Sequence, residues 1–209
     1  MPLQAQRLMK VQLGNHRNDV DEHDEVWAEV DEICVHADYN ERRKTADIAI
    51  IKLKQPVSMS SRIQPVCLPR NYEELAEDSE VYVTGWGHTD ARVKSESNHL
   101  KQAMTRVIST ESCRGHSGRM VPPSILCGIH DYGSSCENVF VCNYLIRKDL
   151  IVVLSLSTYI VVVGGPEVCG QDDEPMYFTK VSYYMTKFIL PYINPKSSRQ
   201  TLQKICKSS

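Results

Sequence analysis

Asp47 is the first candidate for chemistry in this 209-residue chain, because its carboxylate heads a strongly β-prone apolar run, residues 45–53 (TADIAIIKL). Such an Asp is either a surface residue that caps the start of a strand or a group with a chemical role. A second set of carboxylates lies in residues 19–25 (DVDEHDE). Their hard oxygen atoms suit Ca²⁺, although a solvated charged loop is the more ordinary interpretation.

Eight cysteines are many for a chain of this length, and they favour disulfides and an oxidising compartment. Their spacing alone does not fix which cysteines pair. No Cys-x₂-Cys pair with matching His spacing occurs, so we do not expect zinc. The first ten residues (MPLQAQRLMK) lack the apolar core and the small-residue cleavage site of a signal peptide. We still expect an extracellular, secreted protein, although no signal peptide is present in this chain.

The overall composition is that of an ordinary globular protein, with 42% hydrophobic and 24% charged residues and a formal net charge of −2. The basic residues form no stripe, which argues against nucleic acid and anionic membranes as partners. The most apolar run, residues 150–163, is too short to span a membrane. Its β-branched residues and the Gly-Gly-Pro sequence after it predict one or two buried strands.

Short strands that bury one face account for most of the chain. Apolar and polar residues alternate, or nearly so, in three segments: residues 81–84, 103–107 and 176–181. One amphipathic helix is predicted near the C-terminus, since apolar residues recur there at helical spacing until Pro191. These residues are Val181, Tyr184, Met185, Phe188 and Ile189. After Asn194 the sequence becomes polar, which predicts a frayed tail that carries Cys206.

Seven motifs in a fixed order identify a family. They are VQLGNH (11–16), VHADYN (35–40), DIAIIKL (47–53), QPVCLP (64–69), VTGWGHT (83–89), LCG (126–128) and FTKVS (178–182). In this order they resemble the chymotrypsin/trypsin family of serine proteases, over residues of about 11–193. The resemblance implies an all-β fold of two antiparallel six-stranded barrels with a C-terminal helix and a catalytic cleft between the barrels.

The resemblance also sets the expected domain limits. We expect a partial trypsin-like serine protease domain in residues 1–194 and a polar tail in residues 195–209. The family's opening strands have no counterpart, so the first barrel is expected to be incomplete at its N-terminal side. Its remaining strands would then have unpaired edges.

The resemblance gives Asp47 the role of the catalytic Asp, which orients the imidazole that activates a nucleophilic Ser. The family's Ala-Ala-His-Cys segment has no counterpart, and His16 and His36 occupy positions that are not catalytic. Residues 134–142 (SSCENVFVC) correspond to the nucleophile segment but lack its Gly-Asp-Ser-Gly-Gly core. The surrounding block, residues 138–163, hardly matches the family, whereas both flanks match well. This pattern suggests exon loss or a wrongly predicted transcript.

The expected substrate pocket also departs from the family. Ser134 corresponds to the pocket floor, where Ser resembles the chymotrypsin-like preference for large apolar side chains. Gly165 belongs to the segment that binds the substrate backbone. Met176 replaces a Gly, so its side chain would narrow or plug the pocket.

Disulfides and a metal loop are implied in the same way. The resemblance pairs Cys113 with Cys127 and Cys136 with Cys169. It leaves four cysteines without an expected partner: Cys34, Cys67, Cys142 and Cys206.

The acidic cluster falls on a loop that binds Ca²⁺ in many members, with Glu22 and Glu25 at the two later carboxylate positions. The two earlier ligand positions read Asn15 and Arg17, so we expect neither a metal nor a cofactor.

The resulting functional prediction is a serine endopeptidase domain of this family, which would act on proteins or peptides through an acyl-enzyme. It is expected to be inactive as written, that is, a truncated protein or a pseudoprotease. The alternative is a secreted, non-catalytic homologue that binds a protein partner.

Overall fold

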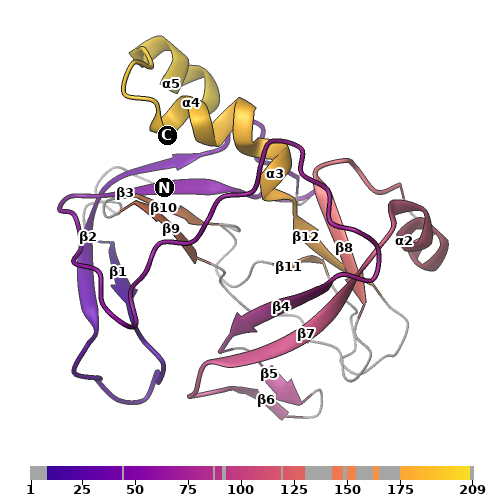
Figure 1. Ribbon diagram of the computed structural model, residues 1–209, viewed down its shortest axis with the longest axis horizontal. Coiled ribbons are helices and arrows are strands. Elements are labelled where there is room, and N and C mark those ends of the chain that lie inside the picture. The colour runs from indigo at the N-terminus through magenta and orange to yellow at the C-terminus, as the bar shows by residue number, and fades with distance from the viewer. Residues whose placement is uncertain are drawn as a thin grey trace.

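The computed structural model describes residues 9–43, 45–86, 88–90, 93–118, 120–129, 143–147, 150–153, 162–164 and 175–207. Within these residues the main elements are two five-stranded antiparallel sheets, which lie side by side (Figure 1). This architecture, with helices at the C-terminus, agrees with the predicted trypsin-like all-β fold.

The first sheet has the order β1-β2-β3-β10-β9. Its strands are β1 (Lys10–Leu13), β2 (Val26–Val35), β3 (Ala49–Leu53), β10 (Leu150–Val153) and β9 (Asn143–Arg147). The second sheet has the order β11-β12-β8-β7-β4. It comprises β11 (Val162–Gly164), β12 (Met176–Thr179), β8 (Ile125–Ile129), β7 (Lys101–Ile108) and β4 (Glu80–Gly85). A separate hairpin joins β5 (His88–Asp90) to β6 (Val93–Glu96).

Among the described strands the first sheet is open, with β1 and β9 at its edges, as expected for an incomplete barrel, and β3 lies inside it. One edge of β3 pairs with β2, and the other pairs with β10, with Ile51 opposite Ile151 and Ile50 opposite Val152. Both β9 and β10 come from the block that matches the family poorly. The apolar run at 150–163 therefore contributes strands to both sheets, β10 to the first and β11 to the second.

The nearly continuous apolar sequence of β3, interrupted only by Lys52, follows from burial on both of its faces. Ile48, just before the strand, and Ile50 belong to a core cluster with the C-terminal helix, where Phe188 is fully buried. Ile51 and Leu53 belong to a second cluster on the opposite face. A strand buried on two faces cannot alternate polar and apolar residues.

The C-terminal helix begins where the sequence predicts but runs past Pro191. It consists of α3 (Val181–Tyr184), a π-helical turn η1 (Met185–Ile189) and α4 (Leu190–Ile193). The N–H of Leu190 donates to the carbonyl of Met185, five residues earlier. Pro191 then lies in the first turn of α4, where the absence of an N–H is tolerated.

The predicted frayed tail is wrong. Residues Arg199–Ile205 form α5, and the Oγ of Ser198 caps it by accepting from the N–H of Thr201 at 3.1 Å. Cys206 forms a disulfide with Cys34 of β2, so these two cysteines do have partners. Two backbone bonds flank the bridge: Ala37 N–H donates to Ile205 O at 2.8 Å, and Lys207 N–H donates to Val35 O at 2.7 Å.

The tail therefore docks on the end of the first sheet, and α4 and α5 lie over that sheet in Figure 1. The sequence signals for α5 are the Ser198 cap and the apolar residues Leu202 and Ile205. No helix among the described residues is long and apolar enough to cross a membrane.

Candidate functional site

Asp47 lies where the two sheets meet, and only 1% of its surface is exposed. Its backbone carbonyl accepts a hydrogen bond from the Oγ1 of Thr179, at the end of β12, at 3.2 Å. The preceding residue, Ala46, has a positive φ of 50°, a left-handed conformation that is unfavourable for a residue with a Cβ. Backbone strain of this kind is held in place by surrounding structure and often marks functional positions.

The charge of Asp47 influences a neighbouring phenol. Burial, followed by the negative charges of Asp47 and Glu41, raises the pKa of Tyr39 above its ordinary value. The carboxylate of Asp47 is thus placed inside the protein, as a buried orienting group would be, rather than at a surface strand cap.

His36 contributes to packing in this structure. Its ring contacts the rings of Tyr184 and Phe188, with centroids 5.2 and 4.8 Å away. Its Nδ1 accepts a hydrogen bond from the N–H of Asp38 at 3.1 Å. Burial lowers the pKa of His36, against a smaller opposing effect of the Asp38 charge.

The other histidines whose rings have described contacts lie in the acidic-loop region. The rings of His16 and His99 meet edge to face, with centroids 6.0 Å apart. The exposed ring of His23 lies 3.3 Å from the carboxylate of Asp24. These rings pair with each other or with loop carboxylates.

Among the predicted pocket residues, the structure describes Met176, which is fully buried in β12 opposite Gly128. Ser134 and Gly165 lie outside the described residues, as do Cys136 and Cys169.

Cys113 and Cys127 form a disulfide, the pairing that the resemblance implied. It connects α2 (Thr110–Ser117) to β8. Cys67 is a free, exposed thiol.

Glu22 is the most heavily bonded residue of the acidic cluster. Its Oε2 accepts from the backbone N–H groups of His16 at 2.8 Å and Arg17 at 3.1 Å. Its Oε1 lies 2.9 Å from the Nη1 of Arg62. The Arg62 hydrogen bond, followed by those from the backbone, lowers the pKa of the Glu22 carboxyl.

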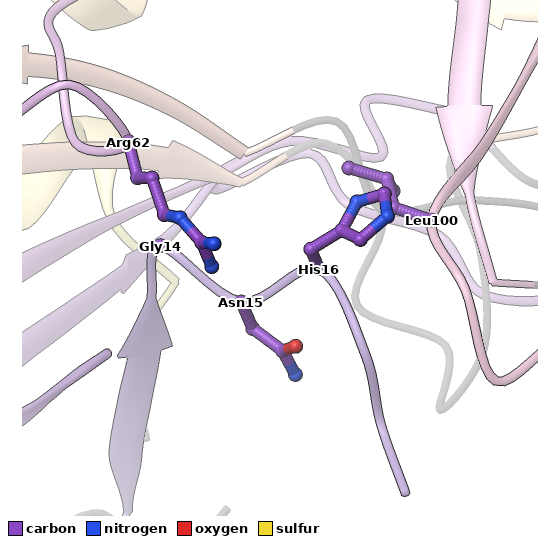
Figure 2. A pocket seen from close by; sticks show the side chains of 5 residues that line it. All are labelled: Gly14, Asn15, His16, Arg62 and Leu100. Atoms are coloured by element: carbon purple, nitrogen blue, oxygen red, sulfur yellow. The ribbon is translucent and has the colours of Figure 1, made fainter. Parts of the chain in front are cut away.

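Arg62 is the residue of this region that sequence reasoning missed. It lies forty residues after Glu22 in the chain, and no motif connects the two. A pocket of about 420 Å³ borders this contact, lined by Gly14, Asn15, His16, Arg62 and Leu100. Figure 2 shows the Arg62 side chain extending toward Gly14 and Asn15, while His16 and Leu100 lie together on the other side.

Comparison with known proteins gives the same family assignment as the motifs. The family model described as Trypsin matches residues 3–188. Vitamin K-dependent protein C from mouse (Mus musculus) is 28% identical over 97% of this chain and 45% of its own length. Trypsin from pig (Sus scrofa) is 28% identical over 85% of this chain and 73% of its own. Chymotrypsin-C from rat (Rattus norvegicus) is 39% identical over 50% of this chain and 39% of its own. The chain thus spans less than half the length of the protein C that it matches.

Proposed function

Because the chain belongs to the trypsin family of serine proteases, we propose that it keeps the family's scaffold but does not hydrolyse peptide bonds. The observation that carries the proposal is the sequence of residues 134–142, SSCENVFVC, at the position of the family's nucleophile segment. A Gly-Asp-Ser-Gly-Gly core would supply both the attacking Ser and the N–H groups that stabilise the oxyanion. Loss of one such donor alone lowers the rate by about 10²–10³, and loss of the Ser leaves only residual catalysis.

The strands that follow this segment support the proposal. β9 and β10 pair with each other, and β10 pairs with β3 in the first sheet. Residues 143–147 and 150–153 thus extend the first sheet beside β3, the strand that Asp47 precedes. These residues serve the fold as sheet strands.

Met176 supports the proposal from the side of substrate binding. Its side chain is fully buried at a position where the resemblance implies a Gly. At the pocket position that the resemblance gives this residue, a buried thioether would fill the space that a substrate side chain enters. A large P1 residue would therefore have no room at this position.

An active-site phosphonate probe tests the proposal, because it reacts with an activated Ser in a serine protease. We expect no labelling of the secreted, disulfide-bonded 209-residue chain under conditions that label pig trypsin fully. Stoichiometric labelling would refute the proposal, and the variants Ser134→Ala and Ser135→Ala would then identify the nucleophile. Far-UV circular dichroism and a disulfide map of the same sample establish that the chain is folded.

A second candidate function is binding of a protein partner outside the cell. It is favoured by exposed apolar residues beside the acidic cluster: Val20, Val26 and Trp27, of which Trp27 is 56% exposed. An exposed Trp flanked by carboxylates suits a basic protein surface. A partner captured from native fluid by the wild-type chain, and lost with Trp27→Ala but not with Tyr82→Ala, would support this function. Equal capture by both variants would contradict it, since Tyr82 is a comparably exposed aromatic residue in β4.

We also propose that the protein is extracellular. Two disulfides among the described residues support this, because such bridges persist in oxidising compartments. We propose domain limits of 1–194, near the residues 3–188 that the family model matches, with residues 195–209 as an additional C-terminal segment, in which α5 and Cys206 contact the first sheet.

A further inference from the structure

The acidic cluster offers a direct test of whether a resident Ca²⁺ fits this chain. Calcium needs six to eight oxygen ligands with free lone pairs. Two buried oxygens here have no hydrogen-bond partner among the residues that the structure describes, Oδ1 of Asn15 and Oε1 of Glu25. Both oxygens of Glu22, however, are already bound by His16, Arg17 and Arg62. The residues present therefore do not fit a bound Ca²⁺, because a guanidinium already holds the central carboxylate.

We propose that Arg62 is the internal cation of this loop: its guanidinium neutralises Glu22 in place of a divalent ion. The loop consequently folds without calcium. As the loop stands, no group of three or more His, Cys, Asp or Glu side chains among the described residues is arranged to hold a metal ion. Without the Arg62 charge, the mutual repulsion of the loop carboxylates would favour uptake of a calcium-like ion.

The distances around Arg62 support this role. Its Nη1 lies 2.9 Å from Oε1 of Glu22, and its Nε lies 4.0 Å from Oδ2 of Asp24. The charge of Glu25 also raises the pKa of Arg62, after the larger effects of Glu22 and Asp24. One arginine thus lies within 4.0 Å of two carboxylates of the loop. Arg17, which lies just before the acidic cluster, forms its own ion pair with Asp19, with 2.9 Å between Nη2 and Oδ2.

The backbone holds Arg62 in position. The Oγ of Ser60 accepts from the N–H groups of both Arg62 and Ile63. Ile63 is buried in the core cluster of the first sheet. The backbone from which the Arg62 side chain extends is thus fixed beside the acidic cluster.

Gly14 lets the three segments of this site approach each other. Its φ is +79°, which favours glycine, and a Cβ there would lie 3.1 Å from the carbonyl oxygen of Asp24 and 3.2 Å from Cγ1 of Ile63. The end of β1, the acidic loop and the Arg62 segment therefore meet at one point. This close approach brings a residue forty positions away to Glu22.

Terbium luminescence tests the proposal, because Tb³⁺ takes oxygen ligands like Ca²⁺ and emits when a nearby indole is excited. The chain has two tryptophans, and both lie next to the acidic cluster. Trp27 follows Glu25 by two residues, and Nε1 of Trp86 donates to the carbonyl of His16 at 3.1 Å. We expect no sensitised emission from the wild-type chain, and the same Tm in EGTA as in millimolar Ca²⁺.

The variant Arg62→Gln removes the charge and keeps hydrogen-bonding capacity. We expect its Tm in EGTA to fall by about 2–4 °C. Ca²⁺ should restore the loss, and Tb³⁺ emission should rise several-fold above the wild-type signal. Arg62→Lys keeps a positive charge and should remain insensitive to both ions. Arg43→Gln, which removes the same charge from an exposed arginine in another loop, is the matched control and should behave as wild type.

Two results would overturn the proposal. The first is a Ca²⁺-dependent rise in the Tm of the wild-type chain, which would show that the loop holds a divalent ion despite Arg62. The second is an Arg62→Gln variant that neither binds Tb³⁺ nor responds to Ca²⁺. If that variant does not fold in EGTA, expression in Ca²⁺ gives the decisive measurement: recovery of folded protein supports the proposal, and failure to recover contradicts it. The phosphonate result does not affect either outcome.

Discussion

Removal of the Cys34–Cys206 disulfide should destabilise the protein more than removal of the Cys113–Cys127 disulfide. The two bridges span sequence separations of 172 and 14 residues. In the chain-entropy account, a bridge restricts the unfolded chain more when it closes a longer loop. The expected contributions are about 5 kcal/mol for the first and about 3 kcal/mol for the second.

The two bridges are matched at one cysteine each. At the other end Cys206 is partly exposed and Cys127 is buried, which makes the packing loss smaller for the Cys34–Cys206 variant. Cys34 and Cys113 are both fully buried, so the loss of packing at these positions is comparable when alanine replaces cysteine. The difference of about 2 kcal/mol therefore reports mainly on loop length and on the anchoring of the tail. Urea unfolding of Cys34→Ala/Cys206→Ala and of Cys113→Ala/Cys127→Ala, followed by circular dichroism, measures it.

Two results would contradict this reasoning. One is an equal or larger loss of unfolding free energy in the Cys113/Cys127 variant. The other is a non-reducing peptide map in which Cys34 and Cys206 are not linked. The map is the more direct test, because the docking of α5 depends on this bridge.

Two further predictions concern the second sheet and the C-terminal helix. A Cβ at Gly128 would lie 2.9 Å from Oγ1 of the buried Thr105, so Gly128→Ala should cost about 1–3 kcal/mol by urea unfolding. A Cβ at Gly115 would have no atom of the described residues within 4 Å apart from its own helix and chain neighbours, so Gly115→Ala should instead stabilise α2 by about 0.5–1 kcal/mol. A loss of stability in both variants would contradict this contrast. Burial lowers the pKa of His36 below its ordinary 6.5, so the unfolded chain binds more protons and the unfolding free energy should fall as the pH drops below about 6.5. His36→Gln should reduce this pH dependence, and His23→Gln, at an exposed position, should not. An equal dependence of the unfolding free energy on pH in the two variants would refute the role of His36.

The sequence predicts the parts of the fold that depend on local pattern. Strands β4, β7 and β12 fall within or around segments that alternate apolar and polar residues. The amphipathic spacing from Val181 to Ile189 gives the start and the buried face of the C-terminal helix. In each case neighbouring residues along the chain carry the signal, because one element buries one face.

The parts that the sequence did not predict depend on contacts between distant segments. Cys34 and Cys206 come together only because α5 folds back on the end of β2, and no spacing rule specifies that contact. β10 pairs with β3 across about a hundred residues. The Arg62–Glu22 contact has the same origin, since Gly14 brings the two segments together.

Asp47 and the nucleophile segment show why a family motif is stronger evidence for fold than for activity. Asp47 heads a strand that is buried on both faces, and the apolar residues after it would be required in any protein with this core. The nucleophile would come from residues 134–142, about ninety positions later, and the apolar sequence of β3 carries no information about that segment. A triad needs both segments within hydrogen-bond reach of one imidazole. Presence of the Asp therefore reports on the sheet that surrounds it, and only the second segment reports on catalysis.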